Sequence, residues 1–507
     1  MSESVAAVLR KLVAFVTGVM LVTTLSAIAV IKADNKKGKT IAIRSGASTA
    51  ATDTSAAADT GTAAADTSGA AGTAAASGTA AGASSGAVTG TGTPAAAGAT
   101  SGGGGGGGAA GAAARQASSA AATSGKCIDE NPEVGVFCDH YLVGGTTVLS
   151  GPLAVYGDQG LKGGLAWITY YNTVIAPREH LRQVKLVWYD DALDPQRTLS
   201  YVQRLHDIDK VLFLSGVTSP EAISAYVQSA KFPLIGDIGL SPKSWRNRYI
   251  FPTTPSDATR NALRIKIAKE RLNIKSFAVI QDVLPSVDTG PYKKSWQDAA
   301  KRSSVEEKDY VEISSTGSDC SAQFSRVIQS KPEYIILPTA SGATLACLRE
   351  GRKNAVQPGG AQSKWLKGWS GGSNLQIEVD NCKPTCEGMY SIGTVFSDPR
   401  TSTTEQMRTY RENMARYAPN VDITGFIAIN YYHNGWLVYN MLKQAGIQNN
   451  LTRDTIMNAA EHFGPFETGF GNSVTWNTTV PREPWTCGYP VVVRGDKWVF
   501  DSQRYCL

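Results

Sequence analysis

Apolar residues are arranged in two alternating patterns from about residue 140 onward. Short, β-branched or apolar runs resemble buried strands, and each is followed by a longer stretch with helical spacing. In 160–172, for example, Leu161, Leu165 and Ile168 fall on one face of a helix. The strand-like runs are 141–148, 184–189, 211–214, 277–280 and 334–337. This alternation predicts an α/β fold with parallel sheets covered by helices on both faces.

Polar and small residues follow each predicted strand. Asp194 precedes Pro195, and Ser219 precedes Pro220, so each pair predicts a helix start. In open parallel sheets, ligands bind beyond the carboxyl ends of the strands, where helix N-termini present free N–H groups. The loops expected to form a binding site are therefore 149–158, 215–219, 237–241, 282–290, 339–342 and 368–373.

The periodic pattern is absent before residue 127. The stretch 40–126 consists almost entirely of Ala, Gly, Ser and Thr and includes seven consecutive glycines at 102–108. Such a composition cannot bury enough apolar surface to offset the entropy of ordering, which predicts disorder. We therefore expect an N-terminal segment at 1–34, a disordered linker at 35–126 and a folded part at 127–507.

An uncharged run at 12–31 follows Arg10 and Lys11. As a helix it would rise about 30 Å, enough to cross a bilayer core. It can be a signal peptide cleaved after Ala27-Ile28-Ala29, or an uncleaved membrane anchor, which its length favours. Lysines at 32, 36, 37 and 39 conflict with export by the positive-inside rule. An anchor with an 87-residue linker, spanning roughly 50 Å, would let the folded part leave the membrane surface and return.

All eight cysteines lie in the folded part. An even count with local spacing predicts disulfides and an extracytoplasmic location, either anchored or secreted, with reduced thiols as the alternative. The expected pairs are Cys127–Cys138, Cys320–Cys347, Cys382–Cys386 and Cys487–Cys506.

The polar composition excludes several classes of site. A net charge of +6 without a basic stripe does not indicate a nucleic-acid surface. The five histidines show no ligand-like spacing to the cysteines, so no metal site is predicted. No phosphate-binding or dinucleotide motif is present, and we expect no cofactor.

Two segments at the start of the folded part carry a family resemblance. One reads Leu149-Ser150-Gly151-Pro152 and continues to Tyr156-Gly157-Asp158, and the other reads Tyr189-Asp190-Asp191 and continues to Asp194-Pro195. Together with the order of elements over 140–498, they resemble periplasmic solute-binding proteins of the Leu/Ile/Val-binding type. The three aspartates are expected to fix the turn and cap the helix rather than contact a ligand.

The resemblance implies two doubly wound parallel-sheet lobes joined by a hinge, with the ligand in the cleft between them. Lobe 1 would comprise about 139–255 and 396–476, and lobe 2 about 256–395 and 477–507. The implied function is the extracytoplasmic solute-binding component of an ABC importer, working as a monomer with a membrane permease and its ATPases.

The loops that would hold an amino acid in this family differ here. The expected hydroxyl residues fall at Gly216 and Leu240, the expected acid at Ser370 and the expected aromatic at Ala340. The scaffold therefore matches, but the amino-acid clamp does not. We expect a small neutral or weakly acidic ligand rather than a branched-chain amino acid. The predicted ligand-binding residues are Tyr156, Ser215, Gly216, Thr218, Gly239, Leu240, Ser286, Val287, Ser341, Trp369 and Ser370.

Two other functions remain open. A membrane-tethered sensor domain would use the same cleft to signal rather than to deliver solute. A serine hydrolase would use the Gly-x-Ser-x-Gly motif at 368–372, with Ser370 activated by His433 or His462. A helix should follow the serine in such an elbow, but the sequence after residue 373 is loop-like. We therefore expect that the protein is not an enzyme.

Overall fold

The computed structural model describes residues 42–43, 127, 129–151, 153–237, 242–283, 289–338, 341–394 and 396–507. The predicted N-terminal segment 1–34 and nearly all of the predicted linker lie outside these residues. Within the described ranges, no helix combines the length and the apolar character needed to cross a bilayer.

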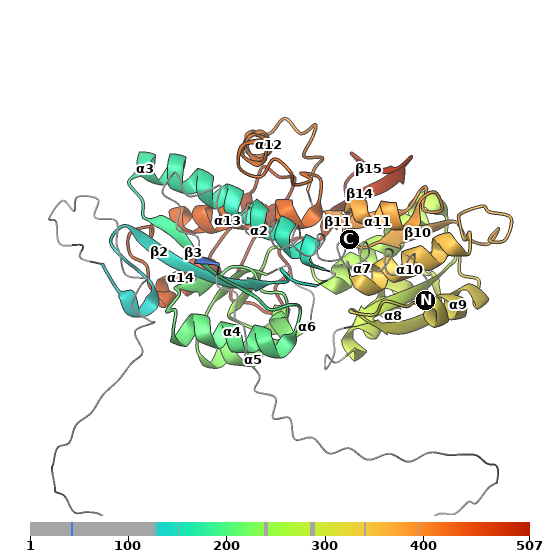
Figure 1. Ribbon diagram of the computed structural model, residues 1–507, viewed down its shortest axis with the longest axis horizontal. Coiled ribbons are helices and arrows are strands. Elements are labelled where there is room, and N and C mark those ends of the chain that lie inside the picture. The colour runs from blue at the N-terminus through green and yellow to red at the C-terminus, as the bar shows by residue number, and fades with distance from the viewer. Residues whose placement is uncertain are drawn as a thin grey trace, which may run out of the picture. The chain divides into compact units, whose positions relative to one another are not determined.

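Lobe 1 is built on a six-stranded, wholly parallel sheet in the order β1-β3-β2-β4-β5-β6. Helices cover both faces, with α2 and α13 on one side and α4 and α5 on the other (Figure 1). Its strands are β1 (Ala42–Ile43), β2 (His140–Thr147), β3 (Gln183–Asp190), β4 (Phe213–Leu214), β5 (Leu234–Asp237) and β6 (Ile250–Pro252). Its other elements are η1 (Pro132–Val134), α2 (Ala154–Tyr170), η2 (Tyr171–Ile175), α3 (Ala176–Glu179), α4 (Pro195–Asp207), α5 (Pro220–Ser229), α6 (Pro242–Arg246), α12 (Glu405–Tyr417), α13 (Phe426–Gln444), α14 (Arg453–Glu461), β12 (Phe466–Glu467) and β13 (Ser473–Val474).

Lobe 2 contains a mixed sheet in the order β15-β14-β11-β10-β9-β7-β8. Strands β8, β7, β9, β10 and β11, which are neighbours in this order, are parallel. Strands β14 and β15 are antiparallel to their neighbours. Its strands are β7 (Ser276–Val283), β8 (Glu306–Ser314), β9 (Tyr334–Ile336), β10 (Gly368–Gly371), β11 (Tyr390–Thr394), β14 (Cys487–Arg494), β15 (Lys497–Phe500) and β16 (Tyr505–Cys506), and its helices are α7 (Asp257–Leu272), α8 (Gly290–Ser303), α9 (Ser321–Gln329), α10 (Gly342–Lys353) and α11 (Gln376–Cys382).

The predicted α/β class with two lobes is confirmed, with one correction. The second sheet is not wholly parallel, because β14 and β15 form a hairpin that adds an antiparallel edge. Within the range expected to be a linker, residues 42–43 form β1, which pairs in parallel with Val187 and Trp188 of β3. The chain passes between the lobes after β6, after β11 and after β13.

Close packing of α2 on α13 fixes one wall of lobe 1. A side chain at Gly163 would place its Cβ 2.2 Å from the carbonyl oxygen of Ala428, so only glycine allows this approach. The same contact brings Tyr431 of α13 toward the strand ends of the sheet, beside Leu161 and Trp188.

The two predicted helix caps behave differently. The Asp194 carboxylate accepts bonds from the backbone N–H groups of Gln196 and Arg197, so the aspartate cap is confirmed. Ser219 occupies the cap position of α5, but its side chain makes no capping bond and its hydroxyl is buried without a partner.

The cysteines of lobe 2 form three disulfides, Cys320–Cys347, Cys382–Cys386 and Cys487–Cys506. Cys127 and Cys138 are free thiols, so the fourth predicted pair is not bonded here. A hydrogen bond from Cys138 lowers the pKa of Cys127, and Arg182 contributes through its guanidinium at 3.7 Å from the sulfur. The thiol of Cys127 is therefore held by polar contacts instead of a covalent bond.

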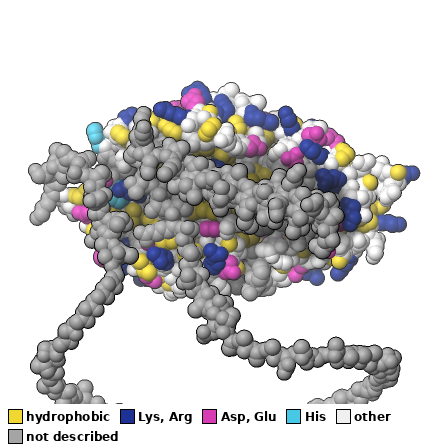
Figure 2. Space-filling view, in the orientation of Figure 1, with side chains coloured by type: hydrophobic (Ala, Val, Ile, Leu, Met, Phe, Trp, Pro, Cys, Tyr) yellow, Lys and Arg dark blue, Asp and Glu magenta, His cyan; other side chains and the backbone are white. Residues whose placement is uncertain are grey.

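Basic and acidic side chains are interspersed over the face seen in Figure 2. Among the described residues, no cluster of His, Cys, Asp and Glu could hold a metal ion.

Candidate functional site

A cavity of about 130 Å³ lies between the two lobes. It lies where the strands end and the following helices begin, as expected for a sheet of this kind. Its lobe 1 wall is formed by Thr147, Val148, Leu153, Tyr156, Gly157, Leu193, Thr218, Phe426, Ile427 and Tyr431, and its lobe 2 wall by Arg260, Pro338, Gly372 and Ser373.

The aspartates after β3 shape the lobe 1 wall. Buried Asp191 accepts hydrogen bonds from the hydroxyls of Thr198 and Thr218 and from the backbone N–H of Leu193. Asp190 accepts one from the backbone N–H of Leu149 at 2.8 Å. The predicted turn-fixing role of these residues is confirmed, and it places Thr218 and Leu193 at the cavity.

Tyr156 reaches the cavity from the first turn of α2. A Cβ at the next residue, Gly157, would lie 1.8 Å from the carbonyl oxygen of Val148, so glycine permits the helix to begin directly against the strand end. The Tyr156 hydroxyl is buried and lies near Ser373 of lobe 2. Burial raises its pKa far above the ordinary value, and the charge of Glu378 adds to this. The hydroxyl is therefore a neutral donor.

Arg260 gives the cavity wall its cationic side chain. It lies in the first turn of α7 and donates a hydrogen bond to Asp257 at 2.5 Å. Arg264, one turn later and fully buried, donates to the carbonyl oxygen of Pro338. Burial, together with repulsion from Arg260, lowers the pKa of Arg264 to about 10, against the attraction of Asp257. Burial raises the pKa of Asp257, although the positive charges of Arg260 and Arg264 oppose the shift.

Two further carboxyls lie close to this wall. Glu378 is buried and accepts hydrogen bonds from the backbone N–H and the hydroxyl of Ser373, at 2.9 and 2.7 Å. Burial raises its pKa to about 7, although the bonds from Ser373 oppose the shift. Burial also raises the pKa of Asp282, at the end of β7, to about 6, opposed by the hydroxyl of Ser341. Both groups therefore titrate near neutral pH.

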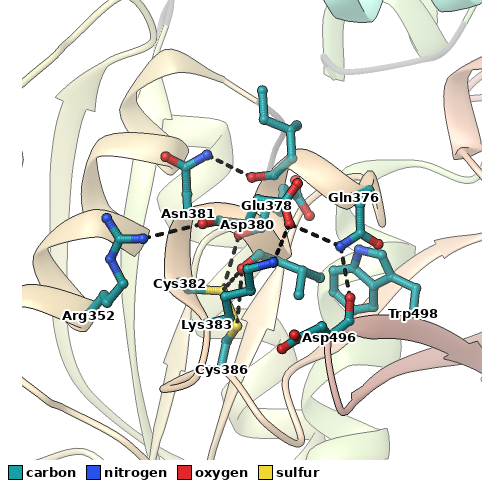
Figure 3. A network of polar contacts seen from close by, with 12 residues as sticks. Arg352, Gln376, Glu378, Asp380, Asn381, Cys382, Lys383, Cys386, Asp496 and Trp498 are labelled. Carbon is teal, nitrogen blue, oxygen red and sulfur yellow. Dashed lines mark hydrogen bonds and ion pairs between the residues drawn. A yellow bond between two sulfur atoms is a disulfide. The ribbon is translucent and has the colours of Figure 1, made fainter.

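A polar network fixes the helix that carries Glu378 (Figure 3). At the start of α11, the indole N–H of Trp498 donates to the carbonyl oxygen of Leu375 at 3.0 Å, and Gln376 donates to that of Asp496 at 2.8 Å. At its end, Lys383 pairs with Asp380 and the Cys382–Cys386 disulfide closes the turn. These contacts hold the Ser373 turn at the edge of the cavity.

The same turn joins the two lobes. Asn374, held at a left-handed φ of 49°, donates its side-chain amide to the carbonyl oxygen of Thr424 in lobe 1 at 2.7 Å. Leu375 is buried against Val148, Leu153 and Tyr156 of lobe 1. The lobe 2 segment thus closes directly over the lobe 1 wall.

We expect Asn374→Ala to weaken closure of the cleft. The substitution removes the bond to Thr424 and places alanine at a strained left-handed φ, so ligand affinity should fall about three- to tenfold. Calorimetry on the variant measures this, with Asn354→Ala as the control, because Asn354 makes its bonds only to Glu350 within lobe 2. Unchanged affinity in Asn374→Ala would contradict a closing role for the contact.

Residues 141–497 match the model of a family described as periplasmic binding proteins. The match spans well over half of the chain. The chain belongs to this family. Family membership implies an extracytoplasmic location and a small-molecule ligand. No curated protein sequence matches the chain significantly.

Solved structures show the same fold for this periplasmic binding protein. A leucine-binding protein from Thermotoga maritima is 15% identical with a TM-score of 0.59, covering 71% of this chain and 97% of its own. A fatty acid ABC transporter substrate-binding protein from Thermomonospora curvata is 18% identical with a TM-score of 0.63, covering 74% and 94%. A solute-binding protein from R. palustris, solved with benzoate, is 12% identical with a TM-score of 0.56, covering 71% and 94%.

Some predicted site residues of this periplasmic binding protein face the cavity. Tyr156 and Thr218 line it. Gly216 acts indirectly, because a Cβ there would lie 3.0 Å from the ring of Tyr431, and its absence lets that ring approach. The hydroxyl of Ser215 accepts a bond from Asn434, and that of Ser341 caps α10 through the N–H of Thr344. Gly239, Leu240, Ser286 and Val287 lie outside the described residues.

Trp369 and Ser370 do not line the inter-lobe cavity. Both lie within β10, one strand position or more before the loop. Trp369 is 2% exposed and stacks on Phe324 in the lobe 2 core, with ring centroids 5.7 Å apart. Ser370 is fully buried, and its hydroxyl donates to the carbonyl oxygen of Gly371, at 3.5 Å. The loop that meets the cavity begins two residues later, at Gly372.

The hydrolase motif has no catalytic geometry in this periplasmic binding protein. Ser370 lies on a strand rather than at an exposed turn. His433 is buried in α13 of lobe 1, and burial lowers its pKa to about 3. The family and its structural neighbours are binding proteins.

Several wall residues lie outside the loops predicted from the sequence. Among them are Arg260, Phe426, Ile427 and Tyr431. Of these, Arg260 had a detectable signal. Asp257, Arg260 and Arg264 recur at helical spacing, so three charged side chains share one face of α7.

Proposed function

We propose that the protein is the extracytoplasmic solute-binding component of an ABC importer and encloses a small apolar carboxylic acid between its lobes. The observation that carries this proposal is the composition of the cavity wall. Val148, Leu153, Leu193, Phe426 and Ile427 make it largely apolar, and Arg260 is the charged side chain among its lining residues.

The chemistry of Arg260 favours a carboxylate. A guanidinium presents a planar array of donors that matches the two oxygens of a carboxylate. The Tyr156 hydroxyl can donate a further hydrogen bond in the same space, whereas the hydroxyls of Thr218 and Ser373 donate to Asp191 and Glu378 and act there as acceptors. A cavity of about 130 Å³ suits a single ring or a short chain rather than a long lipid.

Neighbouring structures support the same class of ligand. Solute-binding proteins of this fold were solved with benzoate and with 4-hydroxybenzoate, and one is described as a fatty acid transporter component. In this family a hydroxyl residue helps to hold an amino acid, and Gly216 stands at that position here. Its absence also argues against leucine or isoleucine as the ligand.

The proposal is tested by matched ligands on the purified protein. Benzoate, 4-hydroxybenzoate and hexanoate should raise the melting temperature, because a ligand that binds only the folded state stabilises it. Benzamide keeps the ring but lacks the charge and should stabilise the protein much less. A larger shift with leucine, or equal shifts with benzoate and benzamide, would argue against an apolar acid.

Delivery to a permease is tested separately. Uptake of labelled benzoate should fall in cells that lack this protein and return when it is restored. Binding without any effect on uptake would instead favour a sensor that uses the same cleft.

A further inference from the structure

A second cavity, of about 270 Å³, lies in lobe 1 and shares no lining residue with the inter-lobe cavity. It is lined by residues of α2, η2, α3, α12 and α13 and by Phe470, and α2 and α13 run side by side in Figure 1. Tyr432, Trp436, Tyr439, Asn440 and Lys443 line it at helical spacing, so they form one face of α13. Tyr431, one residue earlier, faces the inter-lobe cavity instead.

Aromatic rings form the floor of this second cavity. Trp167 lies edge-on to Trp436 and to Tyr432, with centroids 5.4 and 5.5 Å apart. A Cβ at Gly435 would lie 1.8 Å from the Trp167 ring, so glycine is required for this packing. The π-helical turn Tyr171–Ile175 follows α2 directly, and such turns occur frequently at functional sites.

One donor in the floor is unused. The indole N–H of Trp436 is buried, and no described residue accepts a hydrogen bond from it. A buried donor without a partner is unfavourable, and a ligand with an acceptor oxygen would satisfy it.

Positive and negative side chains are equal in number around this cavity. Arg178 and Lys443 are cationic, and Glu179 and Glu405 are anionic. Glu179 is already engaged, because it accepts bonds from the Tyr439 hydroxyl at 2.8 Å and from Lys443 at 3.4 Å. The remaining polar lining, Gln406, Thr409 and Asn440, is neutral and carries both donors and acceptors, with one amide hydrogen of Asn440 already donated to the carbonyl oxygen of Trp436 at 2.8 Å. A charged ligand therefore finds no excess of opposite charge.

We propose that this second cavity binds one ring of a neutral saccharide. The partly exposed rings of Tyr170 and Trp436 offer apolar surface to the C–H face of a sugar ring, and amide, hydroxyl and indole groups can bond its hydroxyls. The volume fits one ring rather than an extended chain. The site does not depend on what the inter-lobe cavity binds.

The test is ligand-observed saturation-transfer NMR on the full chain, with N-acetylglucosamine and methyl glucoside as probes and choline as a cationic rival. We expect saturable binding of a sugar that benzoate does not compete. Trp436→Phe keeps a ring but removes the donor, and Asn440→Ala removes an amide, so each should weaken sugar binding about fivefold or more. Both variants should bind benzoate as the wild type does if they are folded and benzoate occupies the cleft; their melting curves check folding independently.

Three results would overturn the proposal. These are no saturable sugar signal, stronger binding of choline than of either sugar, and loss of sugar binding in the cleft variant Arg260→Gln. The last outcome would place the sugar in the inter-lobe cavity.

Discussion

Replacing Arg260 with glutamine should weaken binding of benzoate or a similar acid by about 10- to 100-fold. The side chain lines the inter-lobe cavity from the first turn of α7, where it donates to Asp257. Without the guanidinium, the ligand carboxylate would be enclosed in an apolar space with only neutral donors, and its desolvation would not be compensated. Calorimetry on the purified variant measures the loss.

The neutral analogue separates a ligand contact from a structural role. Benzamide binding should change little in Arg260→Gln, because benzamide has no charge to pair. Arg453→Gln is the matched control, since Arg453 is a partly buried arginine of lobe 1 that bonds His206 and the carbonyl oxygen of Val211, away from the cavity. Equal losses for benzoate and benzamide would show that Arg260 supports the fold of the cleft rather than the ligand.

Affinity for an acid should rise as the pH falls from about 8 to about 6, by roughly five- to tenfold. Glu378 is bonded to Ser373 at the cavity edge, and burial raises its pKa to about 7. Above this pH its charge repels a bound carboxylate, and below it the repulsion is lost. A simple aromatic acid stays ionised throughout this range because ordinary carboxyl pKa values lie near 4. Glu378→Gln should remove the part of the pH dependence centred near 7 and leave the part that Asp282 contributes near 6.

The same group links pH to stability. The folded-state pKa of Glu378 is raised above its ordinary value of 4.5, so the folded protein binds the proton more tightly than the unfolded chain. The free energy of unfolding should therefore fall as the pH rises from about 4.5 to about 7. Glu378→Gln should be more stable than the wild type at pH 8, on the order of 2 kcal/mol. In the binding experiment, an affinity for the acid that rises with pH would contradict the placement of the Glu378 charge beside the cavity.

Much of the fold could be predicted because its local patterns agree with its tertiary structure. Strand-like runs at 141–148 and 184–189 became β2 and β3, and Asp194 caps the next helix as expected. The mixed edge of lobe 2 was missed, although two β-branched runs flanking Gly495 and Asp496 are typical of a hairpin.

The site was predicted in position better than in detail. Strand order and the rule for strand ends located the cavity, and Tyr156 and Thr218 line it. Trp369 and Ser370 were misplaced because the strand continues through them, so their side chains enter the core. Arg260 and Glu378 were missed because charged residues on a helix suggest a solvated face. Only the tertiary structure shows that these faces turn inward.

The two-residue strand β1 changes how force from the N-terminus would reach the folded part. Ala42 and Ile43 pair with lobe 1, and Cys127 lies against Arg182 of the same lobe, so the chain leaves lobe 1 and returns to it. Tension on the chain before residue 42 would act at β1 rather than at residue 127. Peeling β1 from β3 would move the first attachment to the folded part from residue 42 to residue 127.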